Sequence, residues 1–228
     1  QVYELDFVIE PHRETSFRVE RVAANKTWTE PDVQWSLWRL VRGGAGADDD
    51  DAAGGASRVL LATATGASLA HTCTEVASLE LQWRGARAGA NASAAATRRG
   101  ACRYVRREIR SLTAGDRRKY LAALRVAHEL SDAEGQAKYG ARFVSAQYLA
   151  ALHNAQSWCY HFGCVFFTSH PAFQLALERS LQAVEPSIAT PYWDFLLDSA
   201  SYGGDVLRES VLFTDEYFGP VPAVGNNH

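Results

Sequence analysis

The sequence lacks a long apolar run, a surplus of basic charge and an N-terminal methionine. A helix needs about 20 consecutive apolar residues to span a bilayer, so the first absence excludes a transmembrane helix. The formal net charge of −3 gives no electrostatic basis for binding nucleic acid or an anionic membrane. The chain begins with Gln1 and no signal-like segment follows it, which predicts a processed N-terminus.

Cysteine is scarce in these 228 residues but even in number. Two sequons, Asn25-Lys26-Thr27 and Asn91-Ala92-Ser93, lie in segments that are predicted to be loops, so Asn25 and Asn91 are candidate glycosylation sites. An even number of cysteines together with two sequons predicts a secreted or luminal glycoprotein, in a compartment where disulfides persist. The four cysteines are Cys73, Cys102, Cys159 and Cys164.

Hydrophobic periodicity divides the chain into two parts. Before residue 85, apolar and polar residues alternate on several short runs with turn residues between them, which indicates a small antiparallel β-sandwich. These runs are residues 3–9, 16–22, 33–40, 58–62 and 78–83. From Arg103 onward, apolar residues recur at helical spacing. We therefore predict an α+β fold, with a β-sandwich domain at 1–84 and a mainly helical domain at 103–228.

The helical part is predicted to contain helices at residues 117–130, 143–154 and 171–184. Thr113 is the predicted N-cap of the first of these helices. Pro171 is placed in the first turn of the last helix, because its missing N–H would be unpaired there in any case.

An alanine- and glycine-rich stretch, residues 85–102, lies between the two parts and is predicted to be a linker. Cys73 precedes it and Cys102 is its last residue, and a disulfide between them would clip its ends together in a secreted protein. The sequence does not by itself decide that pairing.

Three of the seven histidines lie close together, and they form the candidate site. His153 ends an apolar-periodic helix, His161 lies in the loop that follows, and His170 precedes the next predicted helix. Neutral imidazole is the commonest metal ligand and suits copper, zinc, iron and nickel, so the trio could bind one metal ion. On spacing alone, three ordinary histidines remain an equal alternative. That ordinary interpretation is kept for His12, His71 and His128.

Several features of this region occur together. His153 closes the segment YLAALH, eight residues separate His161 from His170, and Pro-Tyr-Trp-Asp occupies 191–194. In these features the segment from about Val105 to Gly219 resembles the first half of the type 3 copper proteins, which are the tyrosinases, catechol oxidases and molluscan-type haemocyanins.

The resemblance implies that His153, His161 and His170 hold one copper ion, and that Glu178 corresponds to the glutamate that follows the third ligand in the family. We interpret Glu178 as a packing or ion-pair residue and Asp194 as a buried structural partner. The complete family site has two copper ions that bind O2. Tyrosinases and catechol oxidases then oxidise phenols or o-diphenols to quinones, whereas haemocyanins carry and release the O2.

The resemblance also makes Cys159 a thioether candidate. In many relatives a cysteine two residues before the second ligand is bonded through sulfur to a carbon of a histidine ring, and Cys159-Tyr160-His161 has this spacing. A free buried thiol and a disulfide with Cys164 are the alternatives.

Two departures from the family pattern bear on activity. Ser169-His170-Pro171 lacks the arginine that follows the third ligand in the family, and beyond Asp194 only His228 could serve a second copper ion. The favoured hypothesis is that this chain is a fragment of an oxidase whose second copper half is missing. The alternatives are a partner half on another chain, a non-catalytic extracellular assembly protein, an O2 carrier and, least favoured, a mononuclear copper or zinc enzyme.

Overall fold

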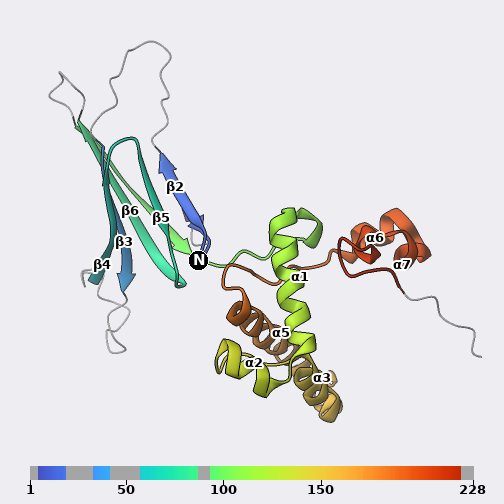
Figure 1. The fold of residues 1–228 in the computed structure, drawn as a ribbon. Helices are drawn as coiled ribbons and strands as arrows, with labels where there is room; N and C mark the ends of the chain where they lie inside the picture. Colours follow the sequence, from blue (N-terminus) through green and yellow to red (C-terminus); the bar gives the residue numbers. More distant parts are fainter. Residues whose placement is uncertain (1–4, 19–32, 42–56, 87–92, 222–228) are drawn as a thin grey trace, which may run out of the picture. The chain divides into compact units, whose positions relative to one another are not determined.

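The computed structural model describes residues 5–18, 33–41, 57–86 and 93–221 (Figure 1). The chain divides into two compact units, Gln1–Tyr104 and Val105–His228. The first is built from strands and the second from helices, which confirms the predicted α+β class. Among the described residues, no helix has the combined length and apolar character needed to cross a bilayer.

The described strands of the first unit form two sheets. The larger sheet has the strand order β1-β7-β6-β3-β4, and the smaller one pairs β2 with β5. Most neighbours are antiparallel, as predicted, but β1 pairs parallel with β7, so the larger sheet is mixed. The strands are β1 Phe7–Ile9, β2 Glu14–Arg18, β3 Val33–Val41, β4 Ser57–Thr65, β5 Ser68–Thr72, β6 Ala77–Ala86 and β7 Ser93–Cys102.

Alternation along the strands builds the core of this unit. Val33, Trp35 and Leu37 of β3 are buried, and the residues between them are more exposed. They pack with Leu79 and Leu81 of β6, and side chains from the smaller sheet join the same cluster. The two sheets therefore enclose one apolar core, as in a sandwich.

The predicted linker is wrong for residues 93–102, because they form β7. This strand pairs with β6 from Ala77↔Cys102 to Ala86↔Ser93 and with β1 on its other side. The strand was not predicted because its residues are mostly alanine, glycine and polar residues, which give no clear alternation of hydrophobicity. One of them, Gly100, is needed for packing, since a Cβ at that position would overlap the ring of Phe7. Residues 87–92 of the predicted linker lie outside the described residues.

The disulfide between Cys73 and Cys102 is confirmed, with the two Cα atoms 6.4 Å apart. Cys73 follows β5 and Cys102 ends β7, so the bond ties the smaller sheet to the larger one. Both cysteines are buried in the core. The disulfide therefore joins the ends of two strands within one unit, and it does not clip together the ends of a linker as predicted.

The helical unit is organised around α1 and α5, which lie side by side (Figure 1). Ile109, Ala123, Ala127, Leu181 and Leu212 belong to its buried core. The helices are α1 Ala114–Glu129, α2 Asp132–Tyr139, α3 Ala146–Ala155, α4 Ser157–His161, α5 Val165–Val184, α6 Phe195–Tyr202 and α7 Val206–Glu209. Short 3-10 turns occur at Ile109–Ser111, Gly203–Asp205 and Val211–Phe213.

Local signals explain most of the helix ends. Thr113 is the N-cap of α1, as predicted, and accepts a hydrogen bond from the Asp116 N–H. The prediction that the last helix begins at Pro171 is wrong, because α5 begins at Val165 and contains Pro171 in its interior. The helix tolerates the proline because the carbonyl that loses its donor belongs to Phe167, which is 77% exposed to solvent.

Candidate metal centre

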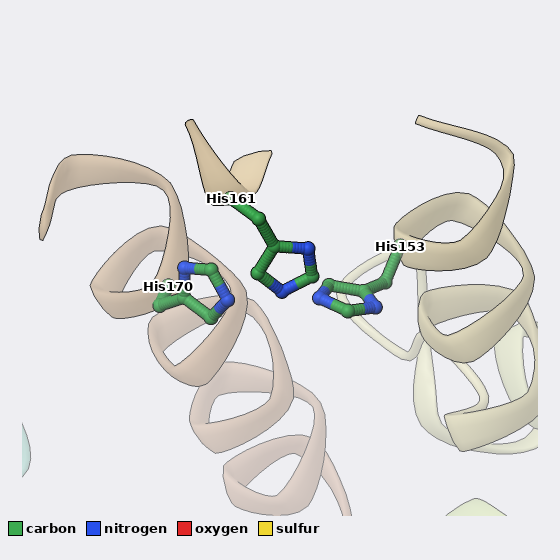
Figure 2. A group of neighbouring side chains, drawn as sticks. All are labelled: His153, His161 and His170. Carbon is green, nitrogen blue, oxygen red and sulfur yellow. The ribbon is translucent and has the colours of Figure 1, made fainter. Parts of the chain in front are cut away.

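Three consecutive helices bring the three predicted histidines together. His153 lies in the last turn of α3, His161 ends α4, and His170 lies in the second turn of α5. One ligand atom from each residue lies within 4.8 Å of the other two. Figure 2 shows one nitrogen of each ring directed toward the space between the side chains. Such a group can hold a single metal ion.

Hydrogen bonds at the start of α3 connect the helix of His153 to the helix of His170. Ser145 caps α3 by accepting from the Tyr148 N–H. The fully buried Ser180 of α5 accepts from the Val144 N–H at 2.9 Å and donates to the Val144 carbonyl at 2.7 Å. The start of α3 is therefore tied to α5, and the two histidines project from this pair of connected helices.

The ring of His170 is oriented by the backbone. Its Nδ1 lies 3.0 Å from the Phe166 carbonyl oxygen and 3.2 Å from the Ser169 hydroxyl. A carbonyl can only accept, so the proton of the neutral ring belongs on Nδ1 in this bond. The lone pair is then on Nε2, which is the usual way in which a hydrogen bond at one ring nitrogen prepares the other for a metal.

Aromatic side chains form the walls of the site. The Phe166 ring centroid lies 4.2 Å from that of His170, and the rings of Phe173 and Tyr160 lie 5.7 and 6.2 Å from that of His153. His153 and His170 are half-buried, whereas His161 is exposed. The trio is therefore apolar on two sides and open to solvent at His161.

Glu178 forms an ion pair, as predicted. It lies two turns beyond His170 on α5 and is buried, and it accepts hydrogen bonds of 2.8 and 3.1 Å from the Arg106 guanidinium. A third bond comes from the Thr190 N–H at 3.0 Å. The hydrogen bond to Glu178 raises the pKa of Arg106 above its usual value. Glu178 thus anchors α5 and does not face the histidines' shared space as a ligand.

The Pro-Tyr-Trp-Asp segment is structural, but its buried carboxylate is not Asp194. Asp194 is half-buried and caps α6 by accepting from the Leu196 N–H. The fully buried carboxylate is Asp198, which accepts from the Trp193 indole at 2.6 Å and from Arg110 at 2.5 Å. The interpretation of Asp194 as the buried partner is therefore wrong. Asp194 is the N-cap of α6, a position that favours aspartate, and the buried carboxylate lies one helical turn later.

The two other cysteines form no disulfide, and Cys159 is half-buried whereas Cys164 is exposed. The alternative of a disulfide between them is therefore not realised. The thioether at Cys159 stays a prediction. Both sequon asparagines, Asn25 and Asn91, lie outside the described residues.

Sequence reasoning missed one residue at the site, Ser157, and one buried ion pair elsewhere in the helical unit, Arg110 with Asp198. Ser157 precedes His161 by four residues, and its hydroxyl lies 3.0 Å from the His161 Nδ1. Residues four apart share one face of a helix, so this spacing was a usable signal. Arg110 and Asp198 are 88 residues apart, and no local pattern in the sequence links them.

Comparison with known proteins agrees with this geometry. Residues 144–223 match the family Tyrosinase, described as the common central domain of tyrosinase, and this range contains all three histidines. The tyrosinase-like protein tyr-3 of Caenorhabditis elegans is 29% identical over 125 residues, which are 55% of this chain and 16% of the relative. The chain thus spans less than a fifth of that relative. The predicted resemblance is confirmed for this part of the chain, because residues 144–223 match the tyrosinase family, to which type 3 copper proteins belong.

Proposed function

We propose that this chain carries the first copper site of a type 3 copper protein that oxidises phenols or o-diphenols to quinones with O2. The observation that carries the proposal is the convergence of His153, His161 and His170 to within 4.8 Å. The histidines come from three elements of a domain that matches the tyrosinase family. These two observations support a metal site at the three histidines. The reaction itself is proposed from the activity of the family.

The donor set fits copper. Three neutral imidazoles without a carboxylate or thiolate suit copper among the first-row metals. Bound copper would supply the exchange of electrons with O2. The chain's own residues would hold the ion, turn the His170 ring through the Phe166 carbonyl, and keep water from two sides with Phe166 and Phe173. The exposed side at His161 leaves access for a small phenol.

A second set of ligands must come from further polypeptide. The family reaction needs a second copper ion, and the described residues contain one group of three suitable donors. Large aromatic side chains beside the site are exposed, with Trp158 at 72%, Phe162 at 73% and Phe167 at 77%. Apolar surface of this kind usually marks an interaction site. The exposed aromatic surface supports the proposal that further polypeptide, from the same or another chain, packs on this side and supplies the second set of copper ligands.

A non-catalytic assembly protein on the same scaffold is the second function that an observation favours. Pro171 follows the third histidine in place of the family's arginine, and the chain adds a disulfide-bonded β unit. An O2 carrier shares the same copper chemistry and differs in having no phenol turnover. The disulfide supports secretion or a luminal location for all of these functions.

Copper content and phenol oxidation decide between these functions. We expect the isolated chain to bind one copper ion, and His170→Ala to abolish binding while His128→Ala, on the exposed end of α1, does not. The whole native protein should bind two ions per chain or per assembled pair and turn a catechol into quinone with uptake of O2. Copper binding without turnover would favour a carrier. A native protein without copper would contradict the proposal and leave the scaffold.

A further inference from the structure

His161 is the histidine of the trio with the least structural support. It ends the five-residue helix α4, whose first turn has no side-chain cap, and it is exposed. So short a helix has little stability of its own. His170, in contrast, lies in the 20-residue α5 and is oriented by a backbone carbonyl. The ring of His161 therefore needs a specific contact to hold it in a ligating orientation.

That contact is Ser157. In the described part of the chain, the His161 ring forms a hydrogen bond with the Ser157 hydroxyl, which lies 3.0 Å from Nδ1. Ser157 begins α4 and His161 ends it, four residues later, so both side chains project from the same face. The bond closes one helical turn and fixes the direction of the ring.

Cys159 lies on the other side of this turn. At 3.6 residues per turn, side chains two positions apart point about 200° away from each other around the helix axis. As long as 157–161 is helical, the sulfur of Cys159 is directed away from the His161 ring. Its thiol is free and half-buried in this conformation.

We propose that Ser157, rather than a thioether from Cys159, is the positioning residue of His161. In this proposal the hydroxyl, 3.0 Å from Nδ1, accepts from Nδ1–H, which leaves the lone pair on Nε2 for the metal. This arrangement matches that of His170, in which the Phe166 carbonyl accepts from Nδ1. This role rests on the proposed function, because Ser157 can position a metal ligand only if His161 binds a metal ion.

The first test measures Cu(II) affinity by competition with a chelator. Hydrogen-bond partners of metal-bound histidines typically change affinity by about 10- to 100-fold, so Ser157→Ala should weaken binding by that factor. Ser157→Thr keeps a hydroxyl and should restore most of the affinity, and Cys159→Ala should leave it unchanged. Circular dichroism checks that each variant is folded. Equal affinity in Ser157→Ala and the unchanged protein would overturn the proposal, as would a loss confined to Cys159→Ala.

The second test needs no metal, so it separates this proposal from the proposed function. Nitrogen NMR of histidine-labelled apoprotein should find His161 with its proton on Nδ1, and Ser157→Ala should shift the proton toward Nε2. A proton on Nε2 in the unchanged protein would contradict the proposal. If the chain binds no copper but shows the expected shift, the proposed function fails and the positioning role of Ser157 remains.

The third test is the intact mass of the copper-loaded protein. A carbon–sulfur bond between Cys159 and a histidine ring removes two hydrogens, so the thioether lowers the mass by that amount. We expect the unmodified mass, together with a Cys159 thiol that an alkylating reagent can reach after unfolding. A mass lower by two hydrogens, with Cys159 protected from the reagent, would overturn the proposal.

Discussion

Arg110 and Asp198 form the shortest charged hydrogen bond between distant segments of the described helical unit, at 2.5 Å between Nη1 and Oδ1. Asp198 is fully buried and also accepts from the Trp193 indole. Arg110 donates in addition to Glu108 and to the Asp194 carbonyl oxygen. The segment before α1 is thereby tied to α6 and to the Pro-Tyr-Trp-Asp motif.

Removing Arg110 should strongly destabilise the helical unit. Arg110→Met leaves the Asp198 carboxylate buried with the Trp193 indole alone, and breaking a buried ion pair in this way costs about 3 kcal/mol. Urea unfolding followed by far-ultraviolet circular dichroism measures the loss. Arg125→Ala is the matched control, because its pair with Glu129 is exposed on α1. Similar losses for both variants would show that the Arg110 pair has no special structural role.

Two glycines of the helical unit should respond in opposite ways to alanine. A Cβ on Gly135 would overlap the ring of the fully buried Phe143, so Gly135→Ala should cost about 1–3 kcal/mol through overpacking. Gly115 lies in the exposed first turn of α1, where its Cβ would meet only the Thr113 hydroxyl at 3.8 Å. Gly115→Ala should stabilise by about 0.5–1 kcal/mol because alanine favours helix. Thermal unfolding of both variants checks the signs, and a stabilised Gly135→Ala would refute the packing described here.

Acid should weaken the helical unit in part through Glu108. Burial acts to raise its pKa, but the hydrogen bonds and charge of Arg110 outweigh burial and hold the pKa below its ordinary value of 4.5. The unfolded chain therefore takes up a proton at higher pH than the folded one. This contribution is fully present above about pH 4.5 and is lost as the pH falls through the lowered pKa of the folded state.

Unfolding in urea at several pH values between about 7 and 3 measures this effect. Glu108→Gln should be less stable than the unchanged protein at neutral pH and should lose less stability on acidification. Glu75→Gln should keep the original pH dependence, because the Glu75 side chain is 72% exposed in its ion pair with Arg39. The same slope in Glu108→Gln as in the unchanged protein would exclude Glu108 as a source.

The Cys73–Cys102 bond should stabilise the β unit and leave the helical unit unchanged. For a sequence separation of 29 residues, loop-closure entropy gives about 3–4 kcal/mol. Each unit has its own buried cluster, so replacing both cysteines by serine should raise hydrogen exchange in β3, β6 and β7 but not in α1 and α5. Cys164→Ser, at an exposed free thiol, is the control. Equal effects on both units would contradict this separation.

The elements that could be predicted from the sequence are those with a local signal. Alternation marked Val33–Val41, and a cap at Thr113 marked the start of α1. The strand Ser93–Cys102 was missed because alanine and glycine give no hydrophobic contrast, although its neighbours β6 and β1 supply the pairing. The start of α5 was predicted too late because Pro171 suggested a helix start. The helix contains the proline instead, and the residue whose carbonyl loses its donor, Phe167, is exposed.

The candidate site divides in the same way. The three histidines followed from their spacing and from the family resemblance. The residues that orient and anchor them did not, because a contact such as that between Ser180 and Val144 depends on how α3 and α5 pack. Tertiary packing sets these contacts, and neither residue type nor spacing reveals it.

Metal binding should stabilise the helical unit through the histidine trio. Zn²⁺ suits imidazole ligands as copper does, and it avoids oxidation of the free thiols of Cys159 and Cys164. A free metal concentration of about 100 times the dissociation constant should add about 2.7 kcal/mol to the free energy of unfolding, and a chelator should reverse the gain. His153→Ala and His170→Ala should lose this gain, whereas His128→Ala should keep it because His128 lies outside the cluster. A gain that persists in His170→Ala would place the bound metal elsewhere and remove the basis for a copper site at this position.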